Sequence, residues 1–296
     1  MDQAEQLRNI VKMKVQPRDV SRVITVTSGK GGVGKTSISV NLALQFQKLG
    51  KRVVILDADF GLANIEVMMG VRPTANLADL MFRGKTLRDI VMTGPEGIGF
   101  ISGGSGIKEL ASMSRDQIFY VMQSLSELDD IADIIIVDTG AGISDSVLEF
   151  AAASEEVLLV ATPEPTSITD AYALLKTLNK TQEFQASRTT IKLVANCVKN
   201  QQEGQEIYDK MRTVAEKFLN IQLEYLGAVV NDTNVSKSVM QQKPLLLAYP
   251  NSAAASSIVQ LVNRLEGDAE VVTDDTKGIK RLFTNLIQSK LRNKGN

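Results

Sequence analysis

The sequence predicts an α/β protein with a doubly wound, mostly parallel sheet and helices on both faces. Seven short apolar runs alternate with longer stretches of helical periodicity, as successive βα units require. The runs 134–136 (III) and 157–160 (VLLV) do not alternate with polar residues, so helices should cover both faces of these strands. The predicted strands are residues 23–28, 52–59, 99–104, 132–140, 156–165, 190–198 and 224–232.

The composition excludes several kinds of chemistry. Cys197 is the only cysteine and the chain has no histidine, which excludes internal disulfides, thiolate clusters, histidine triads and imidazole metal sites. The net charge of −1 gives no global attraction to nucleic acid or lipid. The N-terminus lacks a signal core and no stretch of about 18 uncharged apolar residues occurs, so we expect a cytoplasmic protein without a membrane span.

A glycine-rich loop follows the first predicted strand and precedes a helix predicted at residues 36–49. Residues 29–36 read GKGGVGKT and match the phosphate-loop pattern G-x-x-x-x-G-K-[ST]. Glycines let the backbone turn its N–H groups onto phosphate oxygens, and the helix N-terminus favours an anion. We expect Lys35 to neutralise the β- and γ-phosphates of a nucleotide and Thr36 to bind Mg²⁺. The predicted nucleotide ligands of this segment are Gly29, Lys30, Gly31, Gly32, Val33, Gly34, Lys35, Thr36 and Ser37.

Carboxylates stand at the ends of two other predicted strands. Asp57 and Asp59 end the second strand, and Asp138 follows four apolar residues of the fourth. Ligands of open parallel sheets bind at the carboxyl ends of strands, so these groups should lie near the phosphate loop. We expect Asp57 and Asp138 to hold Mg²⁺ through its waters, the alternative being ordinary strand-end caps. Asp59, two residues beyond Asp57, should face the same side and lie further out.

The loop resembles the deviant Walker motif of the MinD and ParA ATPases, because Lys30 stands near its start in addition to Lys35. The resemblance implies a P-loop ATP hydrolase that uses Mg²⁺ and dimerises on ATP. Lys30 would reach the phosphates bound to the partner subunit, and Asp59 would orient or activate the attacking water. The resemblance spans residues 23–265 and includes the segments 56–66, 134–142, 161–172 and 193–198.

The same resemblance implies contacts to the rest of the nucleotide. Asn196 and Asp232 would bind the adenine base, since an amide and a carboxylate can both bond its polar edge. For Asp232 a polar residue of a surface loop remains the alternative. Glu164 would touch the ribose of the nucleotide held by the partner subunit.

Residues 277–296 predict a basic amphipathic helix, separated from the ATPase domain at 21–265 by an acidic linker at 266–276. Six basic residues and no acidic one lie between 277 and 294. Such a helix is typical of membrane-surface binding, and MinD is similar in this respect. The alternative is a helix packed on the protein's own core. The predicted lipid-facing residues are Ile279, Leu282, Phe283, Leu286 and Ile287.

Residues 1–20 predict a short helix that begins with the segment 2–8, DQAEQLR. This segment resembles the DQAxxLR segment of the FlhG family, MinD-like proteins that control flagellar number. The resemblance implies that the segment docks on the FlhF GTPase and that Gln3 assists GTP hydrolysis. The alternative is a simple N-terminal helix with no partner.

Together these features favour a membrane-recruited ATPase that regulates flagellar number and placement. The expected partners are a second copy of the chain, the FlhF GTPase, lipids of the inner membrane face and flagellar basal-body components. A cell-division MinD and a ParA-type DNA-segregation ATPase are the alternatives of the same class. No specific nucleic acid is expected, and a non-enzymatic adaptor that only binds nucleotide is the alternative of another class.

Overall fold

A computed structural model of the chain describes residues 20–59, 64–103, 115–181, 184–267 and 278–293. The predictions for Gln3 and for nearly all of the linker at 266–276 lie outside these residues. Within them, no helix is long and apolar enough to cross a membrane.

One eight-stranded sheet runs through the molecule in the order β3-β4-β2-β5-β1-β6-β7-β8. All neighbouring strands pair in parallel except β3, which lies antiparallel to β4 at the edge. The seven predicted strands are all present; β3, only two residues long, was not predicted. The strands are β1 Arg22–Ser28, β2 Val53–Ala58, β3 Met92–Thr93, β4 Gly99–Ile101, β5 Ile134–Ala141, β6 Glu156–Ala161, β7 Thr190–Val198 and β8 Leu223–Val230.

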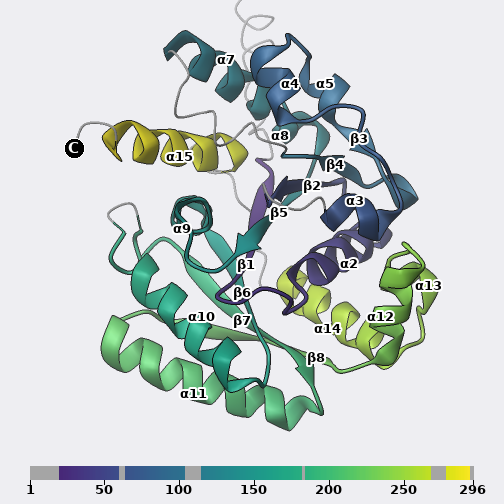
Figure 1. Ribbon diagram of the computed structural model, residues 1–296, viewed down its shortest axis with the longest axis vertical. Coiled ribbons are helices and arrows are strands. Elements are labelled where there is room, and N and C mark those ends of the chain that lie inside the picture. The colour runs from purple at the N-terminus through teal and green to yellow at the C-terminus, as the bar shows by residue number, and fades with distance from the viewer. Residues whose placement is uncertain (1–19, 60–63, 104–114, 182–183, 268–277, 294–296) are drawn as a thin grey trace, which may run out of the picture.

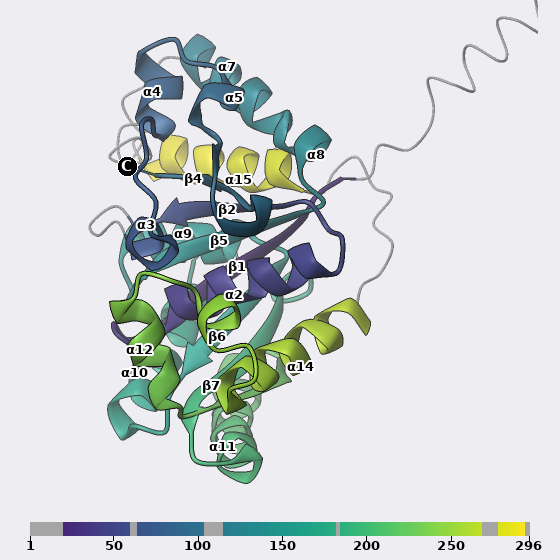
Figure 2. The same ribbon diagram turned by 90° about the vertical axis from the view of Figure 1, so that its right-hand side faces the viewer.

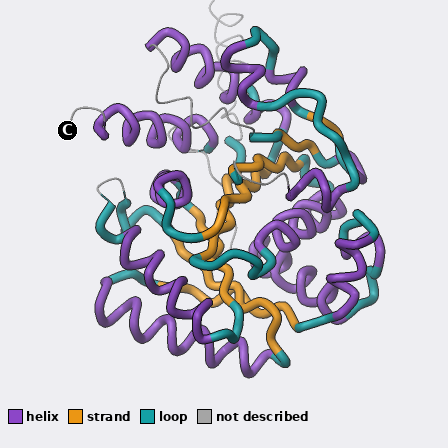
Figure 3. The backbone as a smooth tube through the Cα atoms, viewed as in Figure 1, coloured by secondary structure: helices purple, strands orange, loops and turns teal. Residues whose placement is uncertain are grey.

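Helices cover both faces of the sheet, as the apolar strands require (Figures 1 and 3). The helices are α2 Lys35–Lys48, α3 Asn64–Met69, α4 Leu77–Phe82, α5 Leu87–Ile90, α7 Arg115–Ser126, α8 Leu128–Ile131, α9 Asp145–Ala153, α10 Pro165–Leu178, α11 Gln201–Leu219, α12 Thr233–Met240, α13 Leu245–Ala248, α14 Ala253–Gly267 and α15 Ile279–Asn293, with a 3₁₀ turn at Pro95–Gly97.

Three buried clusters make up the core. One joins α2 and α14 to one face of the sheet. On the opposite face, α9, α10 and α11 cover the half that contains β6 and β7, and α4, α7, α8 and α15 cover the half that contains β2 and β5. The fold is therefore the three-layered, doubly wound arrangement that the sequence predicts, and Figure 2 shows the layers from the side.

The C-terminal helix α15 is part of the core in this conformation. Its apolar residues Ile279, Leu282, Phe283 and Leu286 are at most 2% exposed, and α15 lies against α7 and α9 (Figure 1). Arg281 forms an ion pair with Glu155 at the edge of this contact. In this conformation the helix packs on the core, which is the alternative that the sequence left open, and the prediction that this face meets lipid stays a prediction. Ile287 is not among the side chains described.

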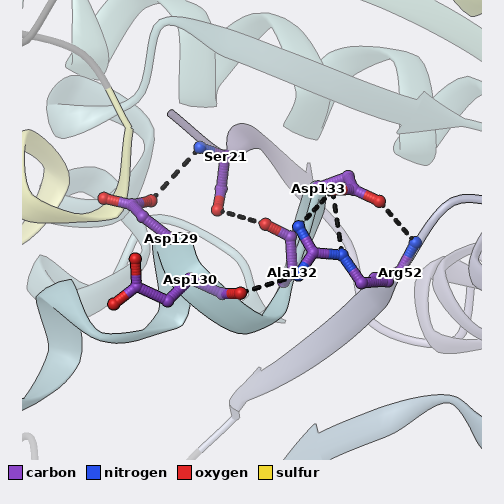
Figure 4. Close-up of polar contacts among 6 residues, drawn as sticks. All are labelled: Ser21, Arg52, Asp129, Asp130, Ala132 and Asp133. Atoms are coloured by element: carbon purple, nitrogen blue, oxygen red, sulfur yellow. Dashed lines mark hydrogen bonds and ion pairs between the residues drawn. The ribbon is translucent and has the colours of Figure 1, made fainter. Parts of the chain in front are cut away.

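Hydrogen bonds hold the chain together at the amino ends of the central strands (Figure 4). The Ser21 N–H donates to Asp129 at 3.2 Å, and the Ser21 hydroxyl donates to the Ala132 carbonyl at 2.7 Å. Arg52 binds Asp133 at 2.5 Å. These contacts hold the turn after α8 against β1 and β2, so the register of the three central strands is set at the edge opposite their carboxyl ends.

The packing of α15 on the core predicts that truncating its buried Phe283 side chain destabilises the protein strongly. Phe283 is fully buried, so Phe283→Ala should lower the free energy of unfolding by about 3–5 kcal/mol, as other buried aromatic truncations do. Denaturant unfolding of the full chain measures it. Lys280→Ala, on the exposed side of the same helix, should change it by less than about 0.5 kcal/mol. Equal midpoints for both variants would show that α15 does not pack on the core in solution.

Candidate functional site

The phosphate loop connects β1 to α2 at the carboxyl edge of the sheet. Gly32 and Gly34 have φ angles of 75° and 92°, a conformation that residues with a Cβ rarely adopt. A Cβ at Gly32 would meet no atom within 4 Å, so the space beside this residue is open. Because Gly34 directly precedes α2, the first N–H groups of the helix lack partners within the helix and are available to an anion.

The other predicted residues of the loop have distinct surroundings. Gly29 passes so close to α10 that a Cβ would lie 2.1 Å from the Asp170 backbone. Gly31 lies beside Ala141, and Val33 is buried in the core. The Ser37 carbonyl accepts a hydrogen bond from Asn41 at 2.7 Å. The loop is thus held from both sides of the sheet.

Lys35 is nearly buried, with an exposed fraction of 8%. Burial lowers the pKa of its ammonium group, and the charges of Asp138 and Asp59 oppose this change. The lysine predicted to meet the phosphates therefore lies within the field of two of the predicted carboxylates.

The structure brings Asp57 and Asp138 together as register partners on β2 and β5. Asp138 accepts hydrogen bonds from the hydroxyl groups of Thr36 at 2.7 Å and Ser39 at 2.8 Å. Asp57 accepts one from the Asp59 N–H at 3.0 Å. Sequence reasoning missed Ser39, although its position three residues after Thr36 places both hydroxyl groups on one face of α2.

Both strand-end carboxylates hold protons more tightly than usual. Burial raises the pKa of Asp57 to about 8, and hydrogen bonding to the Asp59 N–H opposes it. Burial also raises the pKa of Asp138 to about 6, against hydrogen bonds from Thr36 and Ser39. Ionising two neighbouring buried carboxylates is unfavourable, as their raised pKa values indicate. A bound cation would stabilise their ionised forms.

These residues fit Mg²⁺. The ion prefers oxygen ligands and is commonly held by one or two carboxylates together with waters and phosphate oxygens. Thr36, Asp57 and Asp138 offer such oxygens beside the phosphate loop. Among the described residues, no group of three or more acidic, histidine or cysteine side chains forms a metal cage. A site completed by nucleotide phosphates needs no such cage.

Lys30 is held within its own subunit in this structure. Its ammonium group lies 2.5 Å from a Glu164 carboxylate oxygen and 2.8 Å from the Thr166 hydroxyl, at the start of α10. The predictions gave Lys30 and Glu164 separate roles across a dimer interface, so their direct pairing is new. The pair is exposed, and exposed ion pairs contribute only about 0–1 kcal/mol. The pairing of Lys30 with Glu164 therefore stabilises this position of the lysine only weakly.

The two residues predicted to bind the base have different surroundings. The Asn196 side chain is buried and donates to the Val33 carbonyl of the phosphate loop at 2.6 Å. One oxygen of Asp232 accepts from the Asn234 N–H at 2.9 Å and the other from the Ala254 N–H at 3.2 Å. These bonds lower the pKa of Asp232. Asp232 caps α12 and joins it to α14, and its role in base binding stays a prediction.

Asp59 lies next to the last residues of β5. A Cβ on Gly140 would be 3.5 Å from an Asp59 carboxylate oxygen. The Asp59 N–H donates to Asp57, and the Asp59 side chain lies beside Gly140, two residues after Asp138. This is the outer position that the alternation along the second strand predicts.

A phosphate loop with two lysines, a hydroxyl–carboxylate pair and a second carboxylate on the adjacent strand define a P-loop nucleotide-binding protein of the deviant Walker type. A family described as ParA, NUBPL iron-transfer P-loop NTPase, matches residues 19–266. The description mentions iron transfer. This chain cannot hold an iron–sulfur cluster with cysteine thiolates of its own, because Cys197 is its only cysteine.

Comparison with individual proteins shows to which group within this family the chain belongs. The chain is 42% identical to the antiactivator FleN of Pseudomonas aeruginosa, over 83% of this chain and 86% of FleN. It is 35% identical to the flagellum site-determining protein YlxH of Helicobacter pylori, over 97% and 98% of the two chains. MinD of Pyrococcus horikoshii, solved in complex with Mg-ADP, has the same fold, with a TM-score of 0.64 and 20% identity over 88% and 98% of the chains. The chain belongs to the FleN/FlhG group of the MinD/ParA family of ATPases.

The raised pKa of Asp57 predicts how stability depends on pH without metal or nucleotide. The folded protein keeps the Asp57 proton up to a pH of about 8, whereas the unfolded chain releases it near the ordinary value of 3.8. The free energy of unfolding should therefore fall as the pH rises through this window. Asp57→Asn removes the buried charge and keeps an oxygen for the Asp59 N–H.

The variant should be more stable than the parent by an amount on the order of a few kcal/mol above pH 8, and nearly equal to it at low pH. Thermal unfolding across the pH range in the presence of EDTA measures the difference. A difference that does not change with pH would contradict the burial of a titrating Asp57.

Proposed function

We propose that this chain is a Mg²⁺-dependent ATP hydrolase that dimerises on ATP and regulates the number and placement of flagella. The observation that carries the enzymatic part is the set formed by Thr36, Asp57 and Asp138 beside an open phosphate loop. The Mg-ADP bound by the related MinD supports the choice of ligand. The identity to FleN and YlxH supports the flagellar role over a cell-division or DNA-segregation role.

In this proposal the nucleotide phosphates lie along the loop from Gly29 to Ser37. Lys35 offsets their charge, and Thr36, Asp57 and Asp138 hold Mg²⁺, which neutralises the charge that develops in phosphoryl transfer. Asp59, at the outer edge of the site, orients or activates the attacking water. Its place beside Gly140, at the carboxyl end of β5, supports this role, because the same strand carries Asp138 of the proposed magnesium site.

Dimerisation brings Lys30 to the phosphates of the partner subunit. Release of Lys30 also frees Glu164, which then contacts the ribose of the partner's nucleotide. The exposed position of both side chains supports such an exchange, because neither has to leave a buried site.

Replacement of Lys30 tests the dimer. Lys30→Ala should bind ATP as a monomer and lose the ATP-dependent dimer, because the contact that it removes lies across the interface. Size-exclusion chromatography with light scattering, with Mg²⁺ and ATP or ADP, measures the mass. Lys48→Ala removes an exposed lysine at the far end of α2 and should dimerise like the parent. A Lys30→Ala protein that dimerises normally would exclude the role of this lysine across the interface.

Membrane binding requires α15 to leave the core. The apolar face that would meet lipid consists of Ile279, Leu282, Phe283 and Leu286, all of which are buried in the conformation described. The six basic residues between 277 and 294 support an interaction with anionic lipid once the helix is free. We therefore place the protein in the cytoplasm, with a peripheral and conditional attachment to the inner membrane face.

The N-terminal segment stimulates the FlhF GTPase in this proposal. A glutamine offers both a hydrogen-bond donor and an acceptor, so Gln3 can position a water against a γ-phosphate. Ala4, Leu7, Ile10 and Val11 recur at helical spacing and provide a face for docking. Flagellar basal-body components are further partners that the relationship to YlxH favours.

A peptide of residues 1–20 should accelerate GTP hydrolysis by FlhF. The Gln3→Ala peptide should still bind but lose most of the acceleration, and the Leu7→Glu peptide should fail to bind because a charge enters the docking face. GTP turnover and peptide affinity, measured with the same FlhF preparation, separate these effects. If the parent peptide leaves turnover unchanged at saturation, a cell-division role becomes the better explanation.

A further inference from the structure

Ser39 is a buried polar residue of α2 to which the proposed function gives no role. It is 0% exposed, and its hydroxyl donates to Oδ1 of Asp138 at 2.8 Å. A serine has one hydroxyl proton, and inside a helix this proton commonly goes to the carbonyl four residues earlier. Ser39 instead donates it to a side chain of β5, across 99 residues of sequence. The hydroxyl therefore serves Asp138 and not the helix that carries it.

Ser39 and Thr36 hold the two oxygens of the Asp138 carboxylate separately. The two hydroxyl groups lie three residues apart, on one face of α2. Thr36 donates to Oδ2 at 2.7 Å, whereas Ser39 donates to Oδ1. Asp138 is 1% exposed, which leaves little room for water to replace either donor. The plane of the carboxylate is therefore fixed relative to α2.

This arrangement lets a cation beside Thr36 reach only one oxygen of Asp138. Oδ2 faces Thr36, which the proposed function places on the metal, and Oδ1 cannot turn to the same ion without losing Ser39 as its donor. Mg²⁺ requires nearly ideal octahedral geometry at short distances, whereas Ca²⁺ takes more oxygens in a flexible geometry and often binds both oxygens of a carboxylate. A carboxylate fixed in this way therefore favours the smaller ion.

We propose that Ser39 is a positioning residue that makes the nucleotide site selective for Mg²⁺ over larger divalent cations. It holds Asp138 in an orientation that offers one oxygen to the ion and withholds the other. Without the Ser39 hydroxyl the carboxylate can turn, so Mg²⁺ loses a fixed oxygen while Ca²⁺ gains access to a second one. This inference rests on the proposed binding of Mg²⁺ and nucleotide, and it adds which side chain selects the ion.

Binding of ADP with different metals tests the selectivity in the full chain. ADP is titrated calorimetrically into the nucleotide-free protein with EDTA, Mg²⁺ or Ca²⁺, and the gain in affinity over EDTA measures the contribution of each metal. Ser39→Ala and Ser39→Cys both remove the hydroxyl donor, and the cysteine nearly keeps the shape of the side chain. Thermal unfolding shows which of the two retains the fold.

Two further variants separate the role of the hydroxyl from a general effect on stability. Ser39→Thr keeps a hydroxyl group at the same position. Ser257→Ala, on α14, is the matched control. Ser257 is also a buried serine of a helix, but its hydroxyl donates to the Ala253 carbonyl of its own helix at 3.0 Å.

In the parent protein, Mg²⁺ should raise the affinity for ADP more than Ca²⁺ does. The alanine and cysteine variants at Ser39 should lose roughly tenfold of the gain from Mg²⁺, the loss typical of a hydrogen bond to a charged group, and keep the gain from Ca²⁺. Ser39→Thr and Ser257→Ala should retain the preference of the parent.

Equal losses with both metals, or an unchanged preference for Mg²⁺, would reduce Ser39 to a structural role and overturn the inference. A parent protein that does not prefer Mg²⁺ over Ca²⁺ would overturn it as well. A parent protein whose affinity for ADP rises with neither metal would instead refute the proposed magnesium–nucleotide site itself.

Discussion

The burial of negative charge at the carboxyl edge of a parallel sheet is the constraint on which the rest of the site depends. Asp57 and Asp138 are register partners on adjacent strands, at most 3% exposed. Such a pair is costly without a cation, as the raised pKa values of both show. Hydrogen bonds from Thr36, Ser39 and the Asp59 N–H hold the carboxylates in position. In the proposed function, a magnesium–nucleotide complex binds to groups that are already oriented.

The helix α15 gives the fold a second constraint. Its apolar face completes the core over β2 and β5, so the residues that would meet lipid also stabilise the folded chain. Fully burying side chains of this size contributes about 1.5–3 kcal/mol each, and release of the helix forfeits this stabilisation. In the proposed function, lipid contact has to offset that loss, and the two helices of a dimer offset it better than one helix does.

The sequence alone allowed the sheet and the phosphate loop to be predicted, because both depend on local patterns. Short apolar runs identified every strand except β3, whose two residues are too few to show a period. Thr36, Asp57 and Asp138 met as expected, since strand ends converge in a parallel sheet. Helical periodicity also identified α15, but not its environment, because an amphipathic face is the same whether it meets lipid or protein.

The contacts that could not be predicted from the sequence are those between segments far apart in the chain. Asp232 carries the residue type of a base ligand, yet its partners are N–H groups of α12 and α14, set by tertiary packing. The hydrogen bond from Asn196 to Val33 lies beside the register shift at Cys197, and no sequence pattern predicts that shift. Lys30 and Glu164 pair because α10 starts beside the loop, a position fixed by the close approach at Gly29.

The central claim is that the buried carboxylates and the phosphate loop form one site for Mg²⁺ and ATP. Calorimetric titration of ATP into the nucleotide-free chain, with Mg²⁺ or with EDTA, tests it most directly. The account predicts one nucleotide per chain, affinity at least about tenfold higher with Mg²⁺, and no binding in Lys35→Ala. Equal affinity with Mg²⁺ and EDTA, or unchanged binding in Lys35→Ala, would contradict it.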